Sequence, residues 1–215
     1  MAIYLIRHGE TPGNRDRIVQ VPETPLSDRG QGQARRLAER LADHPIGRIL
    51  ASDLTRASMT AEAVGRALGL GVEADPLLQE RNFGDLRGTP YAELEVDLFG
   101  PGFAPPGGET WEVFDARVDR AWQGIRRAAR GLDGHLAVVT HGLVLQSLAR
   151  RHLGLGEDPA GEGLPQQIGN TSLTVVESAG EGPAWEDGSS WRVALLACTA
   201  HLGPDSDGQE GIAGI

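Results

Sequence analysis

The stretch YLIRHGET, residues 4–11, starts with apolar residues and ends in polar ones. Ala2–Ile6 is rich in β-branched and aromatic residues, which is typical of a short internal strand. Arg7, His8 and Gly9 follow at the point where that strand must end. A buried strand end disfavours side chains that carry charge unless a partner or a ligand satisfies them. The stretch therefore predicts a strand whose carboxyl end forms part of a binding site.

Strands and helices alternate along most of the chain around this stretch. The apolar patterns predict strands at 2–6, 47–52, within 71–80, 135–142, 170–178 and 190–199, and helices at 30–45, 54–70, 109–131 and 143–154. Such alternation predicts an α/β fold with three layers, in which helices cover both faces of a mostly parallel central sheet.

The boundaries of the domain follow from length and composition. A chain of 215 residues suits one hydrophobic core, so residues 1–200 are expected to form a single domain. From about 82 to 110 the pattern breaks into short pieces between Gly and Pro clusters, which predicts a short cap excursion over one face of the sheet. The last segment, 201–215, is expected to be a mobile tail.

Composition excludes several classes of partner. The net charge of −10 argues against binding to nucleic acid, which needs a basic face. The single cysteine, Cys198, allows neither an internal disulfide nor a cysteine-based zinc site. No apolar run approaches the length of a signal segment or a membrane span. We therefore expect a cytoplasmic protein with no membrane partner.

Several strand ends carry polar side chains in a related pattern. Residues 7–9 read Arg-His-Gly and residues 140–142 read Thr-His-Gly, so each of two strands ends in a histidine followed by a glycine. A third strand delivers Ser52, with Arg56 about one turn into the next helix, and a fourth delivers Glu80. Ligands of parallel sheets bind beyond the carboxyl ends of the strands, so these side chains are expected to meet.

This set of side chains suits a phosphoryl group. Two guanidinium groups present planar donor forks, and the helix that begins after His141 adds backbone N–H groups. A neutral histidine could attack phosphorus while the other stabilises the group in transfer, and Glu80 could protonate the leaving oxygen and then activate water. A zinc site is disfavoured because two histidines are too few and the arginines repel a cation.

Six motifs carry a family resemblance. They are RHGET (7–11), PLSDRGQGQA (25–34), SDLTRASMTAEA (52–63), ERNFGDLRG (80–88), PPGGET (105–110) and VVTHG (138–142). In this order and at this spacing the chain resembles the histidine phosphatase superfamily, with the phosphoglycerate mutase-like fold. The resemblance runs from about Ile3 to His152, with weaker support from NTSL and AHLG further on.

The resemblance implies roles for five residues. His8 is implied to be the phosphorylated nucleophile, and Glu80 the general acid and base. Arg7, Arg56 and His141 are implied to form the phosphate pocket. No metal or other cofactor is implied.

Two further positions complete the predicted phosphate site. Gly142 is predicted because it lies at the start of the helix after His141, where backbone N–H groups can bind phosphate. Asn14 matches a phosphate ligand of the family, although an asparagine at this position is also typical of a turn. In one respect the chain departs from the family, because Gln20 is followed by Val21 where many members have Gln-Gly. The shape of that loop and its substrate contacts therefore stay open.

Three functions remain open at this point. From 85 to 109 the chain has one arginine, Arg87, and no lysine, while Glu93, Glu95 and Asp97 are acidic. This short acidic cap favours a phosphomonoester hydrolase acting on a small phosphorylated metabolite. The alternatives are a cofactor-dependent mutase, which must grip a doubly anionic sugar acid, and a non-catalytic phospho-ligand-binding protein. Oligomeric state stays open.

Overall fold

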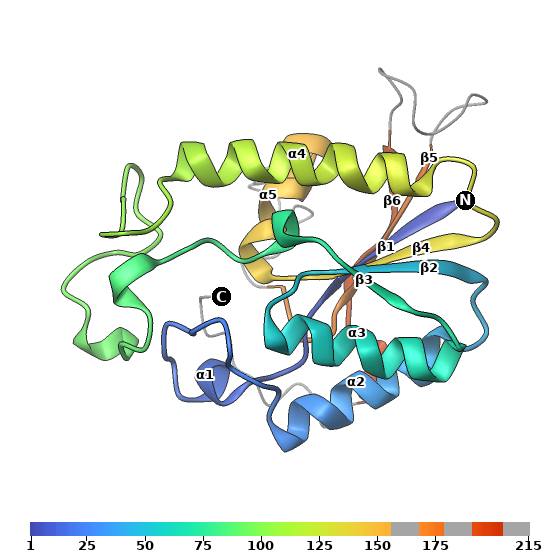
Figure 1. Cartoon of the computed structure of the whole chain (residues 1–215), viewed down its shortest axis with the longest axis horizontal. Helices are drawn as coiled ribbons and strands as arrows, with labels where there is room; N and C mark the ends of the chain where they lie inside the picture. The colour runs from blue at the N-terminus through green and yellow to red at the C-terminus, as the bar shows by residue number, and fades with distance from the viewer. Residues whose placement is uncertain (156–167, 179–190, 204–215) are drawn as a thin grey trace.

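A computed structural model describes residues 1–155, 168–178 and 191–203, and it contains one six-stranded sheet (Figure 1). The strands are β1 (Ala2–Arg7), β2 (Ile46–Ala51), β3 (Val72–Ala74), β4 (His135–Thr140), β5 (Leu173–Ser178) and β6 (Trp191–Cys198). Their order in the sheet is β3-β2-β4-β1-β5-β6. The first four of these pair in parallel, whereas β5 and β6 pair antiparallel.

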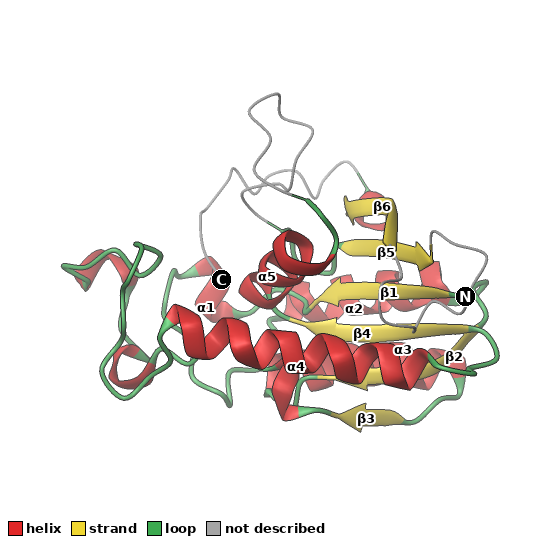
Figure 2. Cartoon of the chain, turned by 90° about the horizontal axis from the view of Figure 1, so that it is seen from above, coloured by secondary structure: helices red, strands yellow, loops and turns green. Residues whose placement is uncertain are grey.

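Helices cover both faces of this sheet. They are α1 (Pro12–Arg15), α2 (Asp28–Leu41), α3 (Thr55–Leu68), α4 (Trp111–Ala129) and α5 (Gly142–His152). Figures 1 and 2 show α4 and α5 on one face and α2 and α3 on the other. The predicted mostly parallel α/β architecture with three layers is therefore confirmed. No helix in the described ranges has both the length and the apolar character that crossing a membrane requires.

The core forms because successive side chains of a strand point to opposite faces. On β1, Ile3 and Leu5 pack with the apolar side chains of α4 and α5, while Tyr4 and Ile6 pack with those of α2 and α3. All six residues of β1 are buried, which explains why its sequence is a continuous apolar run rather than an alternating one.

Local signals account for the helix boundaries. The Ser27 side chain accepts a hydrogen bond from the backbone N–H of Gly30, so α2 begins at Asp28, two residues before the predicted start. Helix α3 ends at Leu68, before Gly69, whose φ of 69° is left-handed. Helix α1 was not predicted, and it forms because Thr11 and Asn14 make a capping box.

The cap, residues 82–110, lies beyond the carboxyl ends of the strands rather than over a face of the sheet (Figures 1 and 2). This differs from the expectation because both of its ends, after Glu80 and before α4, lie at that edge. The cap pairs with the loop after α1 through an antiparallel bridge between Ile18 and Pro90. The backbone N–H of Tyr91 donates to the carbonyl of Arg17 at 2.8 Å.

The segment from His201 onward divides into two parts. Ala200–Leu202 forms a 3-10 turn, and His201 Nε2 lies 3.2 Å from the hydroxyl of Thr171. Residues 204–215, the rest of the predicted tail, lie outside the described residues.

Candidate active site

Strand register brings the two histidines together. Arg7 of β1 pairs with Thr140 of β4, so the next residues, His8 and His141, lie side by side with ring centroids 5.1 Å apart. Ser52 follows β2 on the other side of β4, and its backbone N–H donates to the Val139 carbonyl at 2.9 Å. The structure therefore brings together side chains from three neighbouring strand ends.

His8 is buried and held in one tautomer. Its Nδ1 lies 2.7 Å from the carbonyl oxygen of Gly9, and a carbonyl only accepts, so Nδ1 carries the proton. Nε2 therefore presents a lone pair, and it is buried without a hydrogen-bonding partner among the described residues. Burial, followed by the positive charges of Arg56 and Arg7, lowers the pKa of His8 well below 6.5. His8 is neutral at pH 7, as a nucleophile must be.

Close backbone packing fixes the turn after His8. A Cβ atom on Gly9 would lie 2.7 Å from the carbonyl oxygen of Gly30, so the two loops touch through backbone alone. The Gly9 N–H donates to the Thr60 hydroxyl at 3.0 Å. Because a side chain does not fit at this contact, the glycine in the RHG motif positions the histidine before it.

Ser52 orients His141. The Ser52 hydroxyl accepts from the backbone N–H of Leu54 at 3.2 Å and lies 2.8 Å from His141 Nε2. If the hydroxyl proton is donated to Nε2, the proton of the neutral ring sits on Nδ1, a buried atom with no partner in the described part of the chain. Burial, then Arg56 and His8, lower the pKa of His141 well below 6.5. An Nδ1–H donor suits a phosphoryl oxygen.

Arg7 and Arg56 are both buried beside the histidines. Arg7 donates to the carbonyl of Ile168, and Arg56 donates weakly to that of Val21 at 3.4 Å. Their Nε atoms are buried, and nothing in residues 1–155, 168–178 or 191–203 accepts from them. Burial lowers the pKa of Arg56 to about 10, so it stays cationic at pH 7. Two buried cations with unfilled donors form a site for an anion.

Glu80 reaches the site from a loop rather than from a strand end. Strand β3 ends at Ala74, and a 3-10 turn, Pro76–Leu78, separates it from Glu80. The carboxylate accepts from the backbone N–H groups of Arg81 at 3.0 Å and Leu143 at 3.1 Å. Burial raises the pKa of Glu80 against the opposing effect of these bonds, which favours a protonated, acid-competent form.

The two remaining predicted residues also border the site. A Cβ on Gly142 would lie 3.7 Å from Arg7 Nε and 3.9 Å from Glu80 Oε2, which places the start of α5 between them. Asn14 Oδ1 lies 3.3 Å from Asn170 Nδ2, which also donates to the His8 carbonyl at 3.0 Å. Asn170 was not predicted as a site residue, although it belongs to the NTSL motif.

Tyr91 is a second unpredicted neighbour of the site. Burial, followed by the negative charge of Glu80, raises its pKa to about 12. The guanidinium of Arg17 lies over its ring, 5.7 Å from the centroid. By contrast, the acidic cap residues Glu93, Glu95 and Asp97 are exposed. The acidic charge counted along the cap therefore faces solvent.

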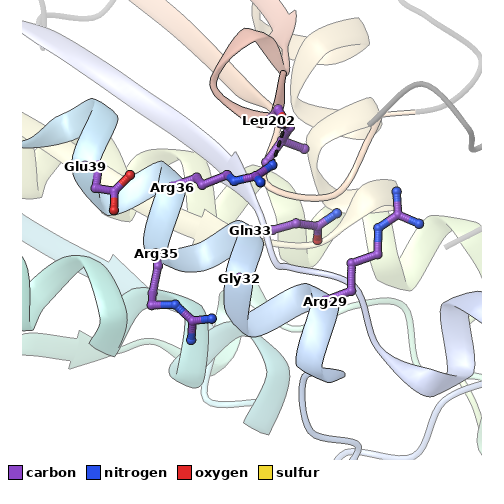
Figure 3. A pocket seen from close by; sticks show the side chains of 7 residues that line it. All are labelled: Arg29, Gly32, Gln33, Arg35, Arg36, Glu39 and Leu202. Atoms are coloured by element: carbon purple, nitrogen blue, oxygen red, sulfur yellow. Dashed lines mark hydrogen bonds between the residues drawn. The ribbon is translucent and has the colours of Figure 1, made fainter. Parts of the chain in front are cut away.

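Other charged side chains lie away from these residues. Arg29, Arg35 and Arg36 of α2 line a cavity of about 430 Å³, and Figure 3 shows Arg36 reaching the Leu202 carbonyl, to which it donates at 2.6 Å. Cys198 is half-buried, and both terminal nitrogens of Arg40 lie 3.4 Å from its sulfur. Across the three described ranges, no three His, Cys, Asp or Glu side chains group so as to hold a metal ion.

Comparison with known proteins places this geometry in a family. The model of the histidine phosphatase superfamily (branch 1) matches residues 3–188. Phosphoglycerate mutase-like protein 4 of Arabidopsis thaliana is 32% identical over 99% of this chain and 91% of its own.

Two solved structures share the fold. YhfR of Bacillus stearothermophilus is 29% identical, with a TM-score of 0.79 over 94% of this chain and 98% of its own. A mycobacterial glucosyl-3-phosphoglycerate phosphatase is 28% identical, with a TM-score of 0.74 over 91% of this chain and 98% of its own. The chain belongs to the histidine phosphatase superfamily.

Proposed function

We propose that this protein hydrolyses phosphomonoesters of small phosphorylated metabolites, through a phosphohistidine on His8 and without a metal ion. The observation that carries the proposal is the lone pair of His8 Nε2, which is buried beside two arginines and has no partner among the described residues. The Nδ1–H bond to the Gly9 carbonyl stabilises the positive charge that the ring gains when Nε2 attacks.

The proposed reaction has two steps. In the first, His8 Nε2 bonds to phosphorus, the bond from phosphorus to the leaving oxygen breaks, and Glu80 gives that oxygen its proton. In the second, water attacks the phosphohistidine, Glu80 takes a proton from it, and the phosphorus–nitrogen bond breaks. Arg7, Arg56 and His141 Nδ1–H bind the phosphoryl oxygens in both steps.

Glu80 gives the first step a pH dependence. Because the carboxyl must be protonated, kcat/KM for an ester with a poor leaving group should fall as the pH rises past the raised pKa of Glu80. Glu80→Gln should remove this dependence and most of the activity on alkyl phosphates. Unchanged turnover of an alkyl phosphate by this variant would contradict the role of Glu80.

Phosphoryl transfer between substrates is the second candidate, because the Arabidopsis relative is named mutase-like. The short cap with a single arginine favours hydrolysis, as does the likeness to a structure named as a phosphatase. The deciding experiment treats the purified protein with EDTA and supplies phosphomonoesters, and 3-phosphoglycerate with and without its bisphosphate. We expect phosphate release without isomer interconversion. Interconversion of the phosphoglycerate isomers with little phosphate release would show that the protein is a mutase and not a hydrolase. Loss of phosphate release after EDTA treatment would contradict metal independence.

A further inference from the structure

Arg117, in the middle of α4, uses all of its donors on one short segment and one carboxylate. Its Nε and one Nη2 N–H donate to the two oxygens of Glu109, at 2.8 and 2.7 Å. Its other N–H groups donate to the carbonyls of Leu77 at 2.9 Å, Gln79 at 2.7 Å and Glu80 at 3.2 Å. A guanidinium has five N–H groups, so none remains for a ligand.

The segment that Arg117 holds is the one that carries Glu80. It lies outside every strand, so no ladder of backbone bonds fixes its position. Two further side-chain bonds tie it down. The Thr140 hydroxyl donates to the Leu78 carbonyl at 2.7 Å, at the end of β4, and Gln79 Nε2 donates to Asp53 Oδ1 at 2.7 Å. The backbone at Glu80 therefore depends on side chains for its place, and Arg117 supplies three of the contacts.

Glu109 holds the same segment from the other side of Glu80. One of its carboxylate oxygens accepts from the backbone N–H of Asn82 at 2.9 Å, and its own N–H donates to the Asn82 carbonyl at 2.8 Å. Burial is the largest effect and acts to raise the pKa of Glu109, but the bonds from Arg117 and from the Asn82 N–H, together with the charges of Arg117 and Arg81, hold the pKa below its ordinary value. Both groups of the pair are therefore charged, and their side chains are only 12% and 14% exposed.

We propose that Arg117 and Glu109 form a positioning pair that sets the place of the Glu80 carboxyl against the leaving oxygen. The pair grips the backbone at 77–80 and at 82, while the carboxyl itself is held by the N–H groups of Arg81 and Leu143. The proposal rests on the role of Glu80 as acid in the proposed function. It assigns Arg117 an effect on proton transfer, which a residue that served only stability would not have.

The test compares two esters of different leaving-group basicity. p-Nitrophenolate leaves without a proton, whereas the alkoxide of glycerol 2-phosphate needs one, so kcat/KM for the second depends on a well-placed acid. We expect Arg117→Gln to lower kcat/KM for glycerol 2-phosphate about 30-fold and that for p-nitrophenyl phosphate by no more than about threefold. Arg117→Lys keeps the positive charge but loses the planar set of guanidinium donors. It should therefore recover only part of the kcat/KM for glycerol 2-phosphate that Arg117→Gln loses.

Arg48→Gln is the matched control. Arg48 also makes a two-bond pair with a glutamate, Glu73, at 2.7 and 2.6 Å, and donates to a backbone carbonyl, but it lies on β2 away from the site. This variant should leave the ratio of the two kcat/KM values unchanged. If Arg117→Gln does not fold, Glu109→Gln tests the same pair and should change the ratio in the same direction by a smaller factor.

The outcomes separate this proposal from the proposed function. Glu80→Gln must itself change the ratio strongly, and if it does not, the role of Glu80 fails. If Glu80→Gln changes the ratio but Arg117→Gln lowers kcat/KM for both esters by the same factor, the positioning pair is overturned while the proposed function stands. A wild-type protein that hydrolyses neither ester overturns both.

Discussion

Two pairs of arginines, all buried except the half-buried Arg117, differ in how their donors are used. Arg56 and Arg81 are each 2% exposed, yet Arg56 has a buried Nε with no acceptor in the described part of the chain. Arg81 donates to the carbonyls of Glu109, Leu98 and Phe103 and stacks on Trp111, 3.8 Å from the ring centroid. Arg7 resembles Arg56 in this respect, and Arg117 resembles Arg81. Among these four arginines, burial alone therefore does not separate the two at the candidate site from the two that hold the backbone; the unfilled Nε does.

The largest effect should come from a binding arginine. Arg56→Gln removes a cation from the proposed phosphate pocket, and we expect kcat/KM to fall by about 10³-fold, because such an arginine contributes roughly 10³–10⁵ to phosphoryl transfer. Steady-state kinetics on a phosphomonoester would measure this. Arg66→Gln is the control, since Arg66 lies exposed on the same helix and pairs with Glu62 at 3.7 Å. A loss below about tenfold would place Arg56 with the structural arginines.

A structural arginine should instead affect stability. Arg81→Met leaves three carbonyls of the cap without their donor, and we expect the free energy of unfolding to fall by about 3 kcal/mol. Urea denaturation would measure the change, with Arg56→Gln as the contrast, which should lose far less. If Arg81→Met were as stable as the wild type, an arginine whose donors all bond to protein carbonyls would not thereby be structural.

The burial of His8 and His141, together with the nearby arginine charges, should also shape the pH dependence of stability. Folding lowers the pKa of His8 and His141 well below 6.5, so below pH 6.5 the unfolded chain takes up protons that the folded protein does not. Stability present at pH 7 should therefore be lost on acidification, by about 2 kcal/mol between pH 6.5 and 5.5 for the two groups together. Urea titrations at several pH values measure this. His8→Ala should lose about half of the effect, and an unchanged slope in that variant would contradict the assignment.

The smallest effect concerns the hydroxyl that orients His141. Ser52→Ala removes the bond to Nε2 and should lower kcat/KM about fivefold, the value of one neutral hydrogen bond. Ser52→Thr keeps a hydroxyl and should recover most of this loss. Equal losses in both variants would show that side-chain volume, and not the bond, matters at this position.

The strand ends were predictable because their signals are local. Each histidine follows an apolar strand directly and precedes a glycine, and parallel register then places His8 beside His141. The helix predicted at 54–70 agrees with α3, Thr55–Leu68, for the same reason, since the apolar spacing along one helix face is a local signal.

The loops around the site were not predictable in this way. Glu80 was expected at a strand end, but Arg117 and Glu109, which lie 37 and 29 positions further along the chain, hold it in a loop beyond a 3-10 turn. Tyr91 reaches the site through backbone pairing with residues far earlier in the chain, and no periodic pattern records such pairing. The antiparallel direction of β5 and β6 likewise leaves no mark in their composition.

The pairing between the cap and the loop after α1 has a consequence for how new specificities arise. Val19 and Gly88 exchange backbone bonds with the opposite segment, and Ile18 bridges Pro90, so each piece shapes the other. A cap taken from a relative would have to pair with the loop after α1 of this protein, whose backbone is shaped to pair with its own cap. We therefore expect the cap and this loop to change substrate selectivity as one module, and chimaeras should exchange residues 17–21 together with 82–110 to keep their backbone pairing intact.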